Sequence, residues 1–411
     1  MSIIRKTAAY ILLISIYGFT YLIALLGSII PHRSWMPTGR IMVTGTFHNP
    51  NWYLSHVIPL TRSGFREVIL VVDEPQLPLE KVRFVCPPKW VSRLLSRAGA
   101  KTIWMTIAGF RYQPDIYMGY HLAPGACSAL VAGKLWGRPS CYQMTSGPVG
   151  IIGGGVDAID SVGGLLGHPS KLIEAMAIKV ASKFELVVVR GKRARGFLAA
   201  HDIKDTVAII TGSVNACPQI PQIDRVIHLV FVGRLSLIKQ VHQFIEIIGA
   251  VRHIMPNVRA AIVGDGPLMT DLQTYAEKLG LTNNIEFLGK RKDVESIIAC
   301  SKIFVLTSKS EGLSIAMAEA MVAGAVPVVA DVGDLSDLVI DGVNGFLVEP
   351  NCIDEYTTKI MFLLQDPSLL EKYSLRAVET ARTHCDIAVV SKKWQQNLQN
   401  VVLQTSGLNT E

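Results

Sequence analysis

Residues 303–350 read IFVLTSKSEGLSIAMAEAMVAGAVPVVADVGDLSDLVIDGVNGFLVEP, and two carboxylates, Glu311 and Glu319, stand eight residues apart within them. The apolar, β-rich runs 302–307 and 326–330 predict two short strands, and the residues between them predict a short helix. A strand, a helix and a strand in this order form a parallel pair with a crossover connection. The stretch therefore predicts an α/β fold built on a parallel sheet.

The helix of this unit is predicted to begin close to Glu311. Ser308 and Ser310 are residue types that cap helix N-termini, and Glu311 would follow in the first turn, where the helix dipole favours an anion. Gly324 is expected to end the helix. Ligands of such sheets bind outside the carboxyl ends of the strands, so loop 307–312 is predicted to face a ligand.

Glu319 has less usual surroundings, because the residues on both sides of it are almost all apolar. A carboxylate in such a run must find hydrogen-bond donors or shift its pKa, since desolvating it unpaired is costly. From spacing alone, a helix cap at Glu311 and a structural ion pair at Glu319 explain the two residues as well as a ligand site does.

The wider pattern resembles the nucleotide-sugar site of the retaining glycosyltransferases of family 4. That family has a Glu-x7-Glu pair in a frame that here reads EGLS from Glu311 and EAMVAGAVPVV from Glu319. The loop DGVNGFLV at 341–348 also looks like the family's next loop, and the resemblance covers nearly all of residues 226–400. It implies the GT-B architecture, an α/β fold of two Rossmann-like domains facing across a cleft, here preceded by one N-terminal hydrophobic helix.

Four segments are expected on this basis. They are a membrane anchor at 1–36, an N-terminal Rossmann-like acceptor domain at 37–216, a C-terminal Rossmann-like nucleotide-sugar domain at 217–384, and a tail at 385–411 with a helix that crosses back. The sequence Cys217-Pro218-Gln219-Ile220-Pro221 is rich in turn formers and is the expected linker.

The anchor is expected because residues 8–30 carry no charge. Twenty-three helical residues span roughly 34 Å, enough for a hydrocarbon core of ~30 Å. Basic residues on both sides of this run leave its orientation open. The seven cysteines have no short paired spacing and the chain has no Asn-x-Ser/Thr sequon, which favours reduced thiols and cytosolic catalytic domains.

Charge is uneven along the chain. Residues 1–225 hold 24 basic and 12 acidic side chains, a net +12, whereas residues 226–411 hold 16 and 21, a net −5. A basic half next to a hydrophobic segment favours an anionic membrane surface as partner over nucleic acid, for which the chain has no aromatic-basic recognition motif. The basic, Trp-containing region 81–104 fits either a helix in the membrane interface or the solvated face of a core helix.

Two cations follow the first strand of the second domain. Gly233 and Arg234 come directly after the apolar run 226–232, and Lys239 stands five residues after Arg234. They resemble the family's diphosphate-binding pair, and Arg and Lys suit phosphate chemically as a fork of donors and a point charge. The two cations would offset the charge that develops on the leaving diphosphate. The sequence has no Asp-x-Asp triplet and no clustered ligand set, so no metal or other cofactor is expected.

The resemblance assigns the remaining residues of the nucleotide-sugar site. Glu319 would accept from the ribose hydroxyls, and Glu311 would hold the transferred sugar. The other expected contacts are the backbone amides at Gly312, Leu313 and Ser314 for the sugar, and Lys290 and Arg291 for the base.

Two residues of the first domain complete the candidate site. His121 follows the strand predicted at 115–120 and looks like the family's histidine at the sugar cleft, although a structural histidine is the alternative. Gly45 is the single glycine in the loop after the first strand, where the family usually has several. It therefore fits either a phosphate-binding loop or an ordinary turn.

The sequence thus predicts a hexosyltransferase-like enzyme that moves a sugar from a nucleotide-sugar donor, expected to be UDP-linked, with retention of configuration. The expected acceptor is lipid-linked or a polysaccharide, and the expected location is the membrane. A nucleotide-sugar epimerase of the same fold and a catalytically silent membrane scaffold are the alternatives.

Overall fold

The computed structural model describes residues 3–29, 35–47, 49–157, 162–215 and 224–406. The chain divides into two compact units, the first formed by Met1–Gly212 with Ala388–Glu411 and the second by Ser213–Ile387. The expected linker at 217–221 lies outside the described residues. Each unit is built on one parallel sheet.

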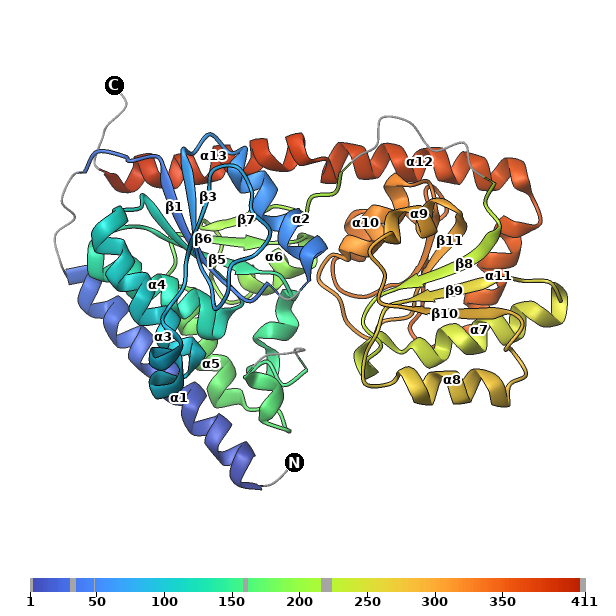
Figure 1. Ribbon diagram of the computed structural model, residues 1–411, viewed down its shortest axis with the longest axis horizontal. Helices are drawn as coiled ribbons and strands as arrows, with labels where there is room; N and C mark the ends of the chain where they lie inside the picture. The colour runs from blue at the N-terminus through green and yellow to red at the C-terminus, as the bar shows by residue number, and fades with distance from the viewer. Residues whose placement is uncertain (1–2, 30–34, 48, 158–161, 216–223, 407–411) are drawn as a thin grey trace. The chain divides into compact units, whose positions relative to one another are not determined.

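The first unit contains a seven-stranded sheet with the order β3-β2-β1-β4-β5-β6-β7 (Figure 1). The strand order reverses between β1 and β4, so the loops after these two strands open the crevice in which such sheets bind ligands. The strands are β1 Arg40–Thr44, β2 Glu67–Val71, β3 Val82–Val85, β4 Ile116–Tyr120, β5 Ser140–Met144, β6 Leu186–Val189 and β7 Val207–Ile209.

Successive side chains of each buried strand point to opposite faces of the sheet. Both faces are therefore apolar, and helices cover both of them. Ile41 faces α2 and α13, where Trp394 of α13 is buried. Met42 faces α3 and α4, where it contacts the cluster that contains Met105. The helices of this unit are α1 Ile3–Ile29, α2 Pro50–Thr61, α3 Lys89–Tyr112, α4 Cys127–Trp136, α5 Lys171–Ala181, α6 Lys192–Ala199 and α13 Ile387–Ser406.

Region 81–104, expected to be a helix either in the membrane interface or on the solvated side of the core, is a strand followed by a helix. β3 occupies Val82–Val85, and α3 begins at Lys89. α3 is interrupted at Ser96, which has φ 65° and ψ 163°. The apolar residues at the start of the region belong to β3, the edge strand of the sheet, which pairs with β2. A purely helical interpretation overlooks this strand.

The second unit contains a six-stranded parallel sheet with the order β10-β9-β8-β11-β12-β13. The order reverses between β8 and β11. The strands are β8 Ile227–Val232, β9 Ala260–Val263, β10 Ile285–Gly289, β11 Ser301–Leu306, β12 Val326–Ala330 and β13 Phe346–Val348, and the helices are α7 Val241–Ile254, α8 Met269–Lys278, α9 Val294–Ala299, α10 Ile315–Val322, α11 Ile353–Leu364 and α12 Pro367–Cys385.

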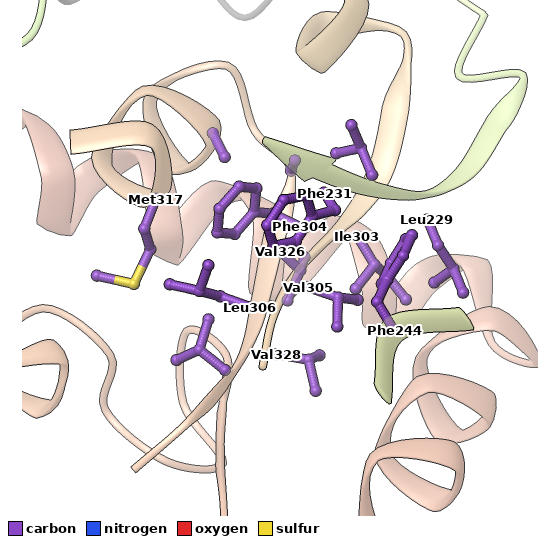
Figure 2. Close-up of a cluster of buried hydrophobic side chains, with 14 of the residues drawn as sticks. Leu229, Phe231, Phe244, Ile303, Phe304, Val305, Leu306, Met317, Val326 and Val328 are labelled. Carbon is purple, nitrogen blue, oxygen red and sulfur yellow. The ribbon is translucent and has the colours of Figure 1, made fainter. Parts of the chain in front are cut away.

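One hydrophobic core joins the sheet of the second unit to its helices. Figure 2 shows Phe231 of β8, Phe304 of β11 and Phe244 of α7 among its side chains, all of them fully buried. The dense apolar packing of β8 and β11 fixes the two strand ends from which the candidate site is built. The remaining short helical turns of the chain lie at Leu122–Ala126, Gly147–Gly150, Ile152–Gly154, Gly163–Leu165, Leu237–Lys239 and Leu335–Asp337.

Candidate functional site

The helix that carries Glu319 begins four residues later than the sequence predicted. α10 starts at Ile315, and Ser314 caps it, its Oγ accepting a hydrogen bond from the backbone N–H of Met317 at 3.2 Å. Glu311 therefore lies in the loop after β11 and not in the first turn of the helix. The sequence analysis named Ser308 and Ser310 as caps and overlooked Ser314, because serine preference alone does not identify the capping residue. The end of the helix before Gly324, which has φ 82°, agrees with the prediction.

Glu311 is held at the switch point of the second sheet by two side chains. Its Oε1 accepts hydrogen bonds from Nζ of Lys239 and from Oγ of Ser308, the latter at 2.7 Å. The side chains of Lys239 and Glu311 are only 18% and 10% exposed, so this ion pair is largely shielded from water. Within the described part of the chain both bonds go to Oε1, which leaves Oε2 able to accept from a ligand hydroxyl.

The backbone joins the two loops that carry this pair. Oγ1 of Thr307 donates to the carbonyl of Lys239 at 3.1 Å or of Gln240 at 3.0 Å, and the N–H of Lys309 donates to the carbonyl of Ile238 at 2.8 Å. The loop after β8 and the loop after β11 are thus one connected structure. This connection brings Lys239 and Glu311 into contact.

Gly233 and Arg234 lie beside the loops after β9 and β10. A Cβ at Gly264 would stand 1.8 Å from the carbonyl oxygen of Gly233, so only glycine fits there. The N–H of Gly264 in turn donates to the carbonyl of Gly289 at 2.9 Å. Arg234 itself is exposed, and its backbone is fixed by the next residue, whose N–H donates to Asp265.

Glu319 points from α10 into partly buried surroundings. Burial, together with a smaller contribution from the nearby Glu295, raises the pKa of its carboxyl from 4.5 to about 7. Among the described residues no cation pairs with it, so the ion-pair interpretation of Glu319 is not what the structure shows. A carboxylate without a protein cation is suited to accept hydrogen bonds from a ligand.

Lys290 and Arg291 lie at the surface after β10. Both side chains are exposed, and the guanidinium of Arg291 binds Asp293 with two hydrogen bonds, at 2.8 and 2.7 Å. This pair raises the pKa of Arg291 and lowers that of Asp293. Lys290 and Arg291 thus follow β10, which is two strands away in the sheet from β8, the strand that precedes Lys239.

In the first unit Gly45 and His121 lie on the two sides of the other switch point. A Cβ at Gly45 would stand 3.0 Å from Cδ2 of Tyr120, so close packing against this ring accounts for the glycine. His121 has φ 57°, a conformation rare outside glycine and found at strained functional positions. Its Nδ1 lies 3.4 Å from the hydroxyls of both Thr145 and Ser146.

A buried polar network next to His121 was missed by the sequence analysis. Arg190 follows β6, and its guanidinium donates to the side chain of Gln143 and to the carbonyl of Ile210, both at 3.0 Å. The amide of Gln143 donates to the hydroxyl of Tyr120 at 3.2 Å. The signal was present: a charged residue directly after the apolar run LVVV sits at a strand's carboxyl end.

A hollow of about 450 Å³ lies at the carboxyl ends of β1, β2 and β3. Three cations of α3 line it, Lys89, Arg93 and Arg97, and among the described residues none of them forms an ion pair. Asp73 also lines it and is paired with the buried Lys101 at 3.1 Å. The exposed Glu74 is the second acidic residue of the lining. Three basic side chains against two acidic ones leave the lining with a net positive charge, which suits an anionic ligand.

The residues that the structure describes contain no group of three or more His, Cys, Asp or Glu side chains that could hold a metal ion. Lys239 forms an ion pair with Glu311, and the exposed Arg234 stands five residues before it in the loop after β8.

The second unit is similar to known proteins in sequence. Residues 218–383 match the family model described as Glycosyl transferases group 1. A UDP-Gal:alpha-D-GlcNAc-diphosphoundecaprenol alpha-1,3-galactosyltransferase of Escherichia coli is 34% identical over 118 residues, 28% of this chain and 30% of that protein. An alpha-D-kanosaminyltransferase of Streptomyces kanamyceticus is 30% identical over 151 residues, 36% of this chain and 39% of that protein. The matched region thus spans less than half the length of these relatives.

Solved structures match over both units. Anabaena HepE in complex with UDP-glucose aligns with a TM-score of 0.68 at 18% identity, covering 88% of this chain and 99% of that one. Sucrose-phosphate synthase from Thermosynechococcus elongatus aligns with a TM-score of 0.71 at 13% identity, covering 88% and 98%. The predicted GT-B fold is confirmed, and residues 218–383 of the chain are similar to the family described as Glycosyl transferases group 1.

Proposed function

We propose that this chain is a retaining glycosyltransferase of the family 4 type, which transfers a sugar from a UDP-linked donor to a lipid-linked or polysaccharide acceptor at a membrane. The observation that carries the proposal is the pair of carboxylates after β11: Glu311 is bound to Lys239, and Glu319 on α10 pairs with no cation of the described residues. The family match over this unit supports it, as does the UDP or UDP-sugar named with several structural neighbours.

The donor's diphosphate would be bound by Arg234 and Lys239. Lys239 already sits in a shielded ion pair, so its ammonium group is positioned before any ligand arrives, and little reorganisation is needed when negative charge develops on the leaving oxygen. We propose that these two cations do this without a metal ion. Activity that survives chelation with EDTA would support this, and activity restored only by added divalent ions would contradict it.

Glu319 would accept from the ribose hydroxyls, and Glu311 would accept from a hydroxyl of the transferred sugar through Oε2. The backbone N–H groups at Gly312, Leu313 and Ser314 follow directly, in a loop held by Asp334, whose N–H donates to the carbonyl of Gly312 at 3.0 Å. The base would lie near Lys290. His121 of the first unit would contact the transferred sugar.

The acceptor would bind to the first unit, in the hollow lined by Lys89, Arg93 and Arg97. An acceptor carried on a phosphate or diphosphate would provide the anion that these unpaired cations favour. The double variant Arg93→Ala, Arg97→Ala is expected to raise KM for such an acceptor several-fold and leave hydrolysis of the donor unchanged. Arg195→Ala, an exposed arginine on α6, is the matched control.

The test of the whole proposal is release of UDP from a panel of UDP-sugars, with and without membrane lipid extract. Release with one donor that requires the extract, and that is lost in Glu311→Gln, is expected. The configuration of the new linkage, read by NMR, reports retention. Tight donor binding without release would identify a silent scaffold, and a donor sugar changed at one carbon without transfer would identify an epimerase.

α1 is proposed to bring the chain to the membrane, with the catalytic units on the cytosolic side. It is long and apolar enough to cross a bilayer, with a mean hydropathy of 2.1 over its most apolar window. Sedimentation of the full chain with membranes is the direct check.

A further inference from the structure

α1 has two faces that differ in what covers them. The buried face repeats at three- to four-residue spacing, as one stripe along a helix does: Ala9, Leu13, Tyr17, Thr20 and Ala24. The other face exposes large apolar side chains to the surroundings of the protein: Ile4, Ile11, Leu12, Phe19, Leu22, Leu25, Leu26 and Ile29. The buried stripe packs on α4 and α5 and belongs to a core that reaches Tyr142 of β5.

Contacts with the first unit continue from one end of α1 to the other. Near its start, the side chain of Lys6 lies so close to Gly167 that a Cβ there would be 2.6 Å from Cε of Lys6. In the middle, Nζ of Lys183 lies 5.3 Å from the ring centroid of Tyr21. Near its end, Gly27 lies against Lys134 of α4, where a Cβ would be 2.7 Å from that of the lysine.

Such packing is incompatible with a span. If α1 crossed the hydrocarbon core in this arrangement, the helices docked along it would be at the same depth. α5 carries Lys171, Glu174 and Lys179, and a charged side chain at the bilayer centre costs at least ~2.5 kcal/mol. If α1 instead left the unit in order to span, the buried stripe would lose its partners and the core around Tyr142 would open.

α3 presents a second row of exposed apolar side chains, on the other side of α4. α1 and α3 both pack on α4, whose residues from Cys127 to Gly133 are buried, and Figure 1 shows the helices together on one side of the first sheet. The exposed row of α3 consists of Trp90, Leu94, Leu95, Ile103, Ile107 and Phe110. We call the exposed apolar rows of α1 and α3 the α1–α3 face.

Charge around this face is mainly positive. The sequences of α1, α3, α4 and α5 contain ten basic residues and a single acidic one, Glu174, whose carboxylate accepts from the N–H of Gly153 at 2.7 Å. Two of the ten, Lys101 and Lys134, form ion pairs with Asp73 and Glu185, and the other eight keep the balance positive. Basic side chains next to exposed apolar ones are the pattern of helices that lie in the interface of an anionic bilayer. α1 needs no polar face of its own, because protein covers its other side.

We propose that α1 does not cross the membrane but lies along the surface of an anionic bilayer, so that the α1–α3 face enters one leaflet only. The inference rests on the membrane location given under the proposed function. It changes the topology: the residues on both sides of α1 stay on the same side of the bilayer as the two units.

The test places an epitope before Met1 of the 411-residue chain and asks whether protease reaches it in sealed, inside-out membrane vesicles. Cleavage of the epitope together with accessibility of the second unit is expected. An epitope protected while the second unit is accessible would overturn the in-plane arrangement and leave membrane association intact. Chain that does not sediment with the vesicles would overturn membrane association itself, and UDP release by that soluble chain would show that the transferase proposal still holds.

A paired variant tests the face directly. Leu22 and Leu26 are 53% and 52% exposed, so Leu22→Asp with Leu26→Asp leaves the packing of α1 on α4 and α5 in place. Binding of the full chain to vesicles with 30% anionic lipid is expected to fall at least about tenfold, because two apolar side chains no longer enter the leaflet. The control, Leu237→Asp with Leu375→Asp, changes two exposed leucines of the second unit and is expected to bind as the unchanged chain does. Equal losses in both pairs would overturn the assignment of this face.

Discussion

At the scale of single residues, the carboxylate pair was found from the sequence, but its surroundings were not. The spacing of Glu311 and Glu319 and the apolar run around Glu319 were visible, so the raised pKa of one carboxyl could be anticipated as one of two outcomes. Ser308 was expected to cap a helix and instead donates to Glu311. Such a bond depends on where a loop turns, which is a tertiary property that local preference does not determine.

The first prediction concerns Lys239. Lys239→Met removes the ammonium group near the leaving diphosphate and is expected to lower the transfer rate by about 10² to 10³, because a preorganised charge is lost where negative charge develops. Steady-state kinetics with a fixed acceptor measure it. Lys309→Met, an exposed neighbour in the loop after β11, is the matched control, and an equal loss in both variants would count against the role of Lys239.

Glu319 makes stability depend on pH. Its folded pKa of about 7 lies above the ordinary value of 4.5, so the folded state is penalised when the carboxyl ionises. This penalty is absent below pH 4.5, grows as pH rises through the window to 7, and is full above it, at most on the order of 3 kcal/mol. Glu319→Gln is therefore expected to raise the unfolding free energy of the chain at pH 8 and to leave it unchanged at pH 4.5. Denaturant titrations at the two pH values measure it, and stabilisation of equal size at both would contradict the assignment.

The same group links nucleotide binding to pH. Ribose hydroxyls that donate to Glu319 favour its ionised form, so UDP is expected to bind up to about tenfold more tightly at pH 8 than at pH 6. Calorimetric titration of UDP reports the affinity. Glu319→Gln separates this effect from the titration of UDP itself, because the part due to Glu319 disappears in it. A pH dependence that is the same in both proteins would remove Glu319 from the site.

At the scale of elements, order and type were predicted better than boundaries. The strand, helix and strand around Glu319 stand at 301–306, 315–322 and 326–330, and both strands agree with the prediction to within about one residue. The helix start was wrong because three serines in seven residues offer the same cap. Region 81–104 was misjudged because a four-residue edge strand leaves too short an apolar pattern to recognise beside a long basic helix.

The cap itself yields a prediction. Ser314→Ala removes the acceptor for the N–H of Met317 and is expected to lower the unfolding free energy by ~1 kcal/mol, with Ser314→Asp restoring most of it. Denaturant unfolding of the full chain measures the change. Ser310→Ala serves as the control, since α10 begins after it, and a larger effect there would show that the helix starts where the sequence suggested.

At the scale of the whole molecule, the uneven charge was visible in the sequence, while its location was not. The net charge is +12 for residues 1–225 and −5 for residues 226–411. In the structure, part of the positive charge lies on the four helices α1, α3, α4 and α5. The long apolar helix α1 was predicted from its length and composition. Composition does not reveal that α1 packs on its own unit, because a buried stripe and a lipid-facing row are equally apolar.

This distribution predicts how membrane binding responds to salt. Raising NaCl from 0.05 to 0.5 M is expected to weaken binding of the chain to anionic vesicles to the level seen with neutral vesicles, because exposed charges are screened within a few ångströms at high salt. Binding that remains reports the apolar contribution of the α1–α3 face. Co-sedimentation at both salt concentrations measures it, and loss of all binding would show that the apolar rows do not enter the bilayer.

The position of Trp394 has a consequence for the order in which the chain can fold during synthesis. This side chain is buried among residues of the first sheet, although it is made 185 residues after the end of that sheet's last strand, β7. Residues 213–387 form a continuous unit and are complete before α13 leaves the ribosome. The second unit can therefore reach its native state first, while the earlier-made unit has α2 on this face of its sheet but still lacks α13.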